Sequence, residues 1–173
     1  MKHYLLLIAF AAIAVTTLAQ STTSADAVLK QARAKAAKEN KNVMVIFHAS
    51  WCGWCHKMDT SLNDPSVKDF FQKNYVIIHL VISESKDKKV LENPGAEELN
   101  QKWGGKNQGI PFWVIMDKDG AILADSQRKP GGNVGCPASA EEVAHFIIVL
   151  KKTSPINAEQ IAKVEKRFRK NEQ

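Results

Sequence analysis

The cysteine pair Cys52 and Cys55 carries the clearest chemistry in this sequence. Two residues separate the thiols, and an apolar run over residues 43–50 directly precedes them, which predicts a buried strand that leads into a redox pair at the start of a helix. At a helix N-terminus, the backbone N–H groups and the helix dipole stabilise a thiolate and lower the pKa of the cysteine. Cys52 is therefore predicted to be the attacking thiol. Cys55, one turn into the helix, is predicted to be the resolving thiol.

The residues beside the two thiols are expected to shape the surroundings of the sulfur atoms. Gly53 lies between the cysteines and permits a tight turn. Trp51 and Trp54 can cover the sulfur atoms with apolar surface. These three residues are therefore part of the predicted site.

Two other interpretations of the cysteines are open at this point. Residues 52–56 also have the CxxCH spacing of a c-type haem site, in which both thiols bind the porphyrin and His56 is an axial ligand. Haem attachment does not require a continuous apolar strand before the motif, whereas a redox helix on a central strand does. Zinc needs two further ligands, and Cys136 with an isolated histidine is a poor second half of a zinc site. We therefore expect no metal and no organic cofactor.

The elements that must hold the cysteine pair follow from the periodicity of apolar residues and from capping residues. The first half of the chain is predicted to form a helix over 24–39, a strand over 43–47, the cysteine helix, a helix that opens at 63–65 with Pro65 in its first position, and a strand over 75–82. The second half is predicted to form a helix over 96–103 and two strands, over 112–116 and 121–125, joined by a turn over 117–120. A helix from 139 to near 152 and a last helix from 157 follow. A charged surface segment is predicted over 83–89 and a loop over 127–137.

The N-terminal residues 1–19 have the pattern of a signal peptide. Lys2 and His3 precede a short apolar stretch, and small residues suit cleavage after Ala19. The apolar stretch is too short for a dependable membrane span, and no cysteine follows the cleavage site, so no stable membrane anchor is expected. We expect residues 20–153 to form one domain and residues 154–173 a helical extension.

The formal net charge of the chain is +6, which raises the question of a nucleic-acid partner. Much of the basic excess lies in residues 30–41 and 163–170, where charged residues are interspersed with alanine, glutamate or apolar residues as on solvated helix faces. Basic and aromatic residues are not interleaved, so no nucleic-acid partner is predicted.

Here the chain resembles the thioredoxin superfamily. The resemblance lies in residues 47–58, which contain the cysteine motif, in Ile110-Pro111, and in the turn over 117–120. It covers residues 25–152 and implies an α/β fold, with a mixed central sheet flanked by helices and the last helix as an addition.

The resemblance also implies a substrate groove. In that superfamily the residue that matches Pro111 is cis and lies beside the disulfide, and the backbone of the preceding residue, here Ile110, pairs with a substrate strand. A trans proline that starts an edge strand is the alternative. The residues expected in the groove are Trp51, Gly53, Trp54, Ile110 and Pro111.

Two positions depart from the pattern of that superfamily. Thioredoxins carry a buried acid in the strand before the cysteines, and the matching residue here is Ile46. His48 and His56 are therefore candidate proton relays, because the ordinary pKa of histidine is about 6.5, and Lys57 is a candidate for electrostatic support of the thiolate. A surface or packing role is the favoured interpretation for each of these histidines, with the relay as the alternative. Cys136 is expected to be an ordinary unpaired or buried cysteine, with a regulatory thiol or an intermolecular disulfide as the alternatives.

These observations predict an exported thiol–disulfide oxidoreductase, periplasmic or secreted in a bacterium. Three cysteines in an exported chain indicate an oxidising compartment. The expected partners are proteins that carry thiols or disulfides, together with an upstream redox protein that recharges the dithiol. Two alternatives from other classes are a c-type haem electron carrier and a non-catalytic binding or chaperone module. The sequence does not distinguish reduction, oxidation and isomerisation of disulfides.

Overall fold

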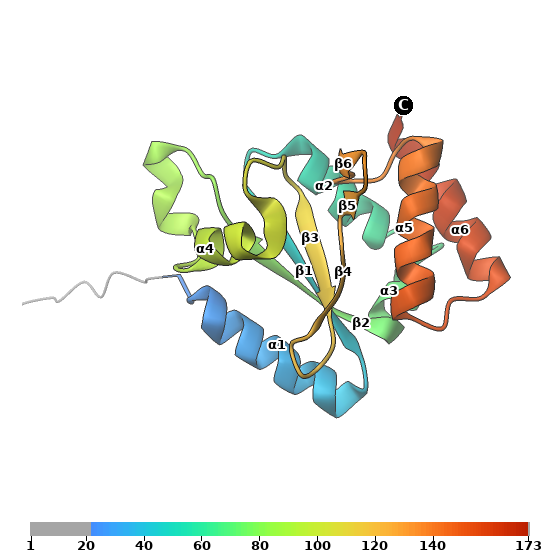
Figure 1. Ribbon diagram of the computed structural model, residues 1–173, viewed down its shortest axis with the longest axis horizontal. Coiled ribbons are helices and arrows are strands. Elements are labelled where there is room, and N and C mark those ends of the chain that lie inside the picture. The colour runs from blue at the N-terminus through green and yellow to red at the C-terminus, as the bar shows by residue number, and fades with distance from the viewer. Residues whose placement is uncertain (1–21, 173) are drawn as a thin grey trace, which may run out of the picture.

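The computed structural model describes residues 22–172, so the predicted signal peptide over residues 1–19 lies outside the described residues (Figure 1). A four-stranded sheet with the order β2-β1-β3-β4 lies at the centre. β1 (Asn42–His48) runs parallel to β2 (Tyr75–Val81) and antiparallel to β3 (Phe112–Met116), which pairs with the antiparallel β4 (Ile122–Asp125). The predicted mixed sheet is therefore confirmed.

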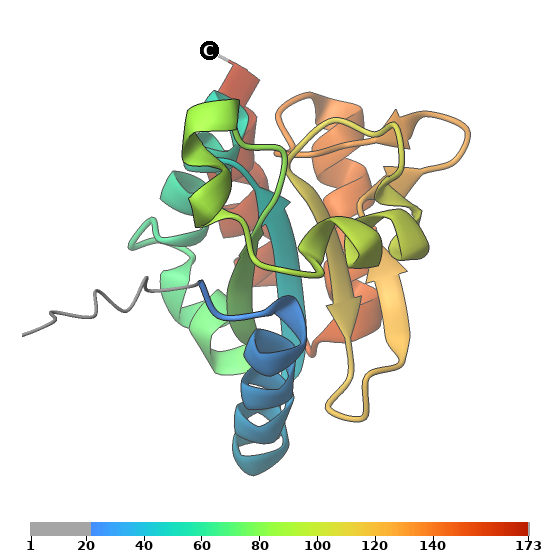
Figure 2. The same ribbon diagram turned by 90° about the vertical axis from the view of Figure 1, so that its left-hand side faces the viewer.

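Helices cover both faces of the sheet, and Figure 2 shows the strands side by side with the first helix in front of them. One side carries α1 (Ala25–Glu39) and α4 (Ala96–Asn100), and the other carries α2 (Gly53–Leu62), α3 (Lys68–Asn74), α5 (Ala140–Thr153) and α6 (Ala158–Phe168). Along β1, Val45 and Phe47 belong to the core under α1, whereas Met44 and Ile46 belong to the core on the opposite face. Because both faces are buried, the strand is a continuous apolar run.

The first helix, α1, begins and ends where its sequence predicts. The Ser24 side chain accepts a hydrogen bond from Ala27 N at 3.3 Å, which satisfies a backbone donor of the first turn. Asn40 closes the helix in the left-handed region with φ 52°. The face toward the sheet consists mainly of small residues, which let the helix lie close to the strands: Ala25, Leu29, Ala32 and Ala36.

Two segments differ from the predictions made around proline and glycine residues. The helix expected to open at Pro65 begins at Lys68, because Asp64 accepts hydrogen bonds from Ser66 N and Ser66 Oγ and so closes a separate turn. The predicted loop over 127–137 contains a small hairpin, in which β5 (Gln127–Arg128) pairs with β6 (Gly132–Asn133).

The connections on the α1 side also contain short helical turns. η1 (Lys86–Leu91) is a 3₁₀ helix within the segment that joins β2 to α4. α4 passes into a wider turn, η2 (Gln101–Gly105), and the helical backbone is interrupted at Gly104, whose φ is 96°. The predicted helix over 96–103 is therefore shorter and less regular than its sequence indicates.

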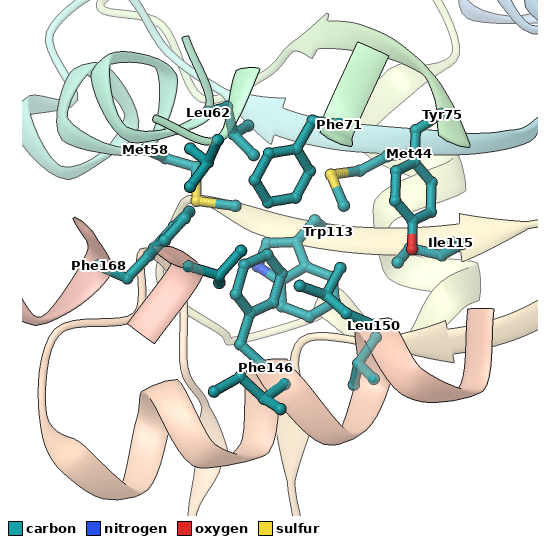
Figure 3. Packing of buried hydrophobic residues seen from close by; sticks show 14 of the residues in the cluster. Met44, Met58, Leu62, Phe71, Tyr75, Trp113, Ile115, Phe146, Leu150 and Phe168 are labelled. Carbon is teal, nitrogen blue, oxygen red and sulfur yellow. The ribbon is translucent and has the colours of Figure 1, made fainter. Parts of the chain in front are cut away.

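The C-terminal helices complete the core on the α2 side. Capping boxes open both helices, with Ser139 and Glu142 at α5 and Asn157 and Gln160 at α6, as predicted. Phe168 from α6 lies among Phe71, Trp113 and Phe146 (Figure 3). A final 3₁₀ turn, η3 (Arg169–Glu172), follows α6. The final helix is thus packed into the body of the protein.

Candidate redox site

The site is built where β1 ends and α2 begins. Cys52 and Cys55 form a disulfide, with their Cα atoms 5.2 Å apart. Cys52 is the N-cap residue of α2, and its Sγ accepts a hydrogen bond from Cys55 N at 3.1 Å. A backbone N–H of the first helical turn therefore points toward the Cys52 sulfur, where it and the helix dipole favour a thiolate once the disulfide is reduced.

The loop before β3 faces the disulfide from the other side. The Ile110-Pro111 peptide bond is cis, as the resemblance implies. Ile110 O lies 3.6 Å from Cys52 Sγ, and Ile110 packs against the small cluster formed by Ala49 and the two cysteines. A groove of about 280 Å³ beside this loop is lined by Trp54, Ile110, Pro111, Val134 and Gly135, among other residues. The two segments that the sequence analysis singled out are thus brought together.

The two tryptophans of the motif are exposed although the cysteines are buried. Trp51 is 59% exposed and its Nε1 donates to Ser83 O at 2.9 Å, while Trp54 is 49% exposed. Gly53 has no positive φ, and a Cβ placed there would have no atom within 4 Å. The tight turn expected at Gly53 therefore does not require glycine. Large apolar side chains flank the disulfide and remain open to solvent.

The candidate relays His48 and His56 lie in different surroundings. His56 Nε2 is 3.0 Å from Ser50 O on an exposed part of the helix start. His48 is half-buried at the end of β1, and its ring centroid lies 4.9 Å from that of His79. His79 Nε2 is 2.7 Å from Asp59 Oδ1, one turn beyond Cys55 on α2. The structure therefore places His48, His79 and Asp59 in one cluster, which the sequence did not predict.

Burial lowers the pKa of His48, with a smaller contribution in the same direction from the nearby His79. The unfolded chain then binds a proton more readily than the folded one, so the contribution of His48 to stability is complete above pH about 6.5 and is lost as the pH falls toward the folded pKa. We expect the free energy of unfolding to fall more between pH 7.5 and 5.5 in the wild type than in His48→Gln. Urea unfolding of the oxidised protein at both pH values measures this, and equal losses in the two proteins would contradict it.

A buried carboxylate from a later segment, which was predicted to be a charged surface, contacts the turn that precedes the motif. Glu84 is only 4% exposed, and its Oε1 and Oε2 accept hydrogen bonds from Ser50 N and Ser50 Oγ at 2.5 and 2.8 Å. Its own N–H donates to Glu92 Oε1 at 2.7 Å. Nothing in the charged run around Glu84 distinguishes it from its exposed neighbours, so its role in holding the turn before Trp51 was missed.

Lys57 lies on the opposite side of α2 from the histidine cluster. Its Nζ is 4.7 Å from the centroid of the Trp54 ring and donates to Asn171 O at 3.1 Å. Asn171 is buried, and its Oδ1 accepts from Ser61 Oγ at 3.0 Å. The C-terminal turn is thus tied to the redox helix beside Trp54.

Cys136 is a free, buried cysteine among residues 22–172. Burial raises the pKa of its thiol to about 12, and Asn171 Nδ2 lies 3.3 Å from its Sγ. A thiolate is the reactive form of cysteine, so this thiol is suppressed as a nucleophile at neutral pH. These surroundings favour the ordinary buried role over the regulatory one.

The comparisons with known proteins agree with this geometry. A family model described as thioredoxin-like matches residues 24–118, more than half of the chain. The chain belongs to the thioredoxin-like family. The predicted class of enzyme, a thioredoxin-like thiol–disulfide oxidoreductase, is confirmed by this membership together with the Cys52–Cys55 disulfide.

One solved structure with a TM-score above 0.5 has the same fold. A disulphide isomerase from Xylella fastidiosa Temecula1 is 19% identical, with a TM-score of 0.51, and the match covers 92% of this chain and all of that one. The C-terminal domain of DsbD from Neisseria meningitidis, in its oxidised form, is 22% identical with a TM-score of 0.45, over 76% of this thioredoxin-like chain and 98% of that one. No curated protein sequence matches the chain.

The described residues contain neither a helix that could span a membrane nor a cluster that could bind a metal. No helix within residues 22–172 is long and apolar enough to cross a bilayer. In the same part of the chain, no group of three or more histidine, cysteine, aspartate or glutamate side chains is arranged to hold a metal ion.

Proposed function

We propose that this thioredoxin-like protein is an exported oxidoreductase that exchanges disulfides with protein substrates through Cys52 and Cys55. The observation that carries the proposal is the position of Cys52, at the N-terminus of α2 and 3.6 Å from Ile110 O in the loop that contains the cis proline. One sulfur thus faces both the stabilising N–H groups and a backbone segment that can bind a peptide.

In the reducing direction, the Cys52 thiolate attacks one sulfur of a substrate disulfide. The substrate S–S bond breaks, a mixed disulfide to Cys52 forms, and the first substrate sulfur leaves as a thiolate that takes up a proton. Cys55 then loses its proton and attacks Cys52 Sγ, which releases the second substrate thiolate and closes the Cys52–Cys55 disulfide. Two electrons pass from the dithiol to the substrate, and the reverse sequence oxidises a substrate dithiol.

The groove beside Pro111 is the proposed docking place for the substrate chain. The backbone of Ile110 would pair with an extended substrate segment, and Trp51, Gly53 and Trp54 would contact the side chains of that segment. The exposure of both tryptophans supports this role, because large apolar surface open to solvent is typical of binding sites. An upstream redox protein would use the same groove when it recharges the dithiol.

The histidines beside α2 are proposed to transfer protons to and from Cys55. His48 is the proposed relay, because it contacts the ring of His79, which reaches Asp59 one turn beyond Cys55. His56 is the second candidate, held near Ser50 O at the exposed helix start. Lys57, over the ring of Trp54, is proposed to favour the thiolate electrostatically.

The site of action is proposed to be the periplasm or the extracellular space of a bacterium. Support comes from the sequence of residues 1–19, in which a short positive region and an apolar stretch end at small residues near Ala19.

The reduction potential of the Cys52–Cys55 pair tests the proposal and gives its direction. The chain from Gln20 would be equilibrated in thiol–disulfide buffers, and free thiols would be trapped and counted by mass spectrometry. A value near the roughly −270 mV of thioredoxin would indicate a reductase, and one near the roughly −120 mV of a strong oxidant would indicate disulfide formation. A pair that does not titrate reversibly would overturn the proposal.

A further inference from the structure

The hairpin β5–β6 lies beside the loop that contains the cis proline (Figure 2). We infer that Asn133 of this hairpin is a positioning residue, which holds the backbone of Ile110 in the geometry that a substrate strand requires. This inference rests on the proposed function and adds to it a residue that determines how protein substrates bind.

The contacts of the Asn133 amide surround Ile110 on both sides. Its Nδ2 donates to Gly109 O at 2.6 Å and to Pro111 O at 3.1 Å. Its Oδ1 accepts from Gly135 N at 3.0 Å. The carbonyls of the residues on either side of Ile110 are therefore engaged by one side chain, while Asn133 bonds neither the N–H nor the C=O of Ile110 itself.

The strand opposite Asn133 holds the far end of the same loop. Gln127 pairs with Asn133 in the hairpin register, and Gln127 Nε2 donates to Gly104 O at 3.2 Å. The loop from Gly104 to Pro111 is thus tied at both ends to one pair of residues in the hairpin. Ser126, which precedes β5, donates its N–H to Trp113 O at 2.9 Å, so the hairpin is anchored to β3 and can hold the loop in place.

The loop needs such external support because of its composition. It contains Gly104 and Gly109, and both Gly104 and Asn107 adopt positive φ, at 96° and 61°. Glycine-rich backbone loses more conformational freedom than other backbone when it is ordered. Hydrogen bonds from Asn133 offset that loss before the substrate arrives, so less of the binding free energy is spent on ordering the loop.

The backbone that follows Asn133 packs closely against the proline loop. Gly135 has φ 54°, and a Cβ at this position would lie 3.4 Å from Pro111 O. The Gly135 carbonyl accepts from Trp113 Nε1 at 2.8 Å, which joins the end of the hairpin to the first residues of β3. The hairpin is therefore held against the proline loop from two directions.

The test compares Asn133→Asp and Asn133→Ala with the wild type. Asn133→Asp keeps the shape and the acceptor for Gly135 N but removes both donors. Lys129→Ala is the matched control, since Lys129 is exposed in the turn between β5 and β6. Three quantities are measured for each protein: KM and kcat for insulin disulfides with dithiothreitol as reductant, the rate at which dithiothreitol alone reduces the Cys52–Cys55 disulfide, and the reduction potential.

Both Asn133 variants are expected to raise KM for insulin by about threefold to tenfold, the scale of one or two lost hydrogen bonds. The kcat, the rate with dithiothreitol alone and the reduction potential should stay within about twofold of the wild type, because a small reductant does not need the peptide groove. Lys129→Ala should match the wild type in all three. A purely structural defect would instead change the rate with dithiothreitol and the potential as well.

The outcomes separate this inference from the proposed function. Wild-type activity on insulin with an unchanged KM in both Asn133 variants would overturn the positioning role alone. A wild type that fails to act on insulin would overturn the proposed function and this inference together. An equal change in the insulin and dithiothreitol rates would assign Asn133 to stability and would also overturn the inference.

Discussion

Cys52→Ser is expected to lower the rate of disulfide exchange with protein substrates by on the order of 10³-fold or more, the scale on which enzymes lose activity without their nucleophile. Serine has no thiolate to attack a disulfide at neutral pH, although it fits the N-cap position that Cys52 occupies in α2. The fold should therefore survive while the chemistry is lost. Reduction of insulin by dithiothreitol measures the loss.

Two further cysteine variants serve as comparisons for Cys52→Ser. Cys55→Ser keeps the nucleophile but removes the resolving thiol, so it should accumulate a mixed disulfide with the substrate that is visible on a non-reducing gel. Cys136→Ser should keep the wild-type rate, because burial raises the pKa of that thiol to about 12.

The same variants test the alternatives from other classes. Full biological activity and partner binding in Cys52→Ala would contradict the enzymatic role and favour a binding or chaperone module. A Soret band in the purified wild type would instead favour haem attachment through Cys52, Cys55 and His56. Neither result is expected for a thioredoxin-like chain whose two sulfurs are joined to each other.

Phe168→Ala is expected to lower the free energy of unfolding by about 3–5 kcal/mol, the usual cost of removing a large buried aromatic side chain. Phe168 is fully buried, and its ring centroid lies 4.9 Å from that of Phe146 and 6.1 Å from that of Phe71 (Figure 3). The lost ring would leave a cavity between α6 and the sheet side of the core. Urea unfolding followed by circular dichroism measures the change.

Ile148→Ala on α5 is the control for that experiment. Ile148 is 64% exposed, so its truncation should change the free energy of unfolding by less than about 0.5 kcal/mol. Phe168→Leu should cost less than Phe168→Ala, because leucine fills more of the same space. If Phe168→Ala costs no more than Ile148→Ala, α6 does not contribute to the cooperative core.

Features that depend on local sequence were predictable here. The apolar run before Cys52 predicted β1, and the capping boxes at Ser139 and Asn157 predicted where α5 and α6 begin. In each case neighbouring residues alone decide the outcome, through backbone hydrogen bonds or through burial on two faces. The cis bond at Pro111 followed from the resemblance to the family rather than from its own neighbours.

Features that depend on distant contacts were not predictable. Glu84 stands in a charged run, and only the fold brings Ser50 over its carboxylate. Asn133 was part of a predicted loop, because strands of two residues carry no periodic signal and their pairing is decided by the surrounding structure. His79 reaches Asp59 only through the register of β2 beside β1. The residues that contact the site from distant parts of the chain are therefore determined by the fold and not by the local sequence.

The contact between Asn171 and Cys136 bears on how the chain oxidises correctly. A protein with three cysteines can form wrong pairs during folding, and a free thiolate near a disulfide can displace one of its sulfurs. Once the C-terminal turn has docked, Asn171 Nδ2 lies on the Cys136 sulfur, and burial keeps that thiol protonated. The C-terminal turn η3 therefore covers the third sulfur and leaves Cys52 and Cys55 as the accessible pair for disulfide exchange.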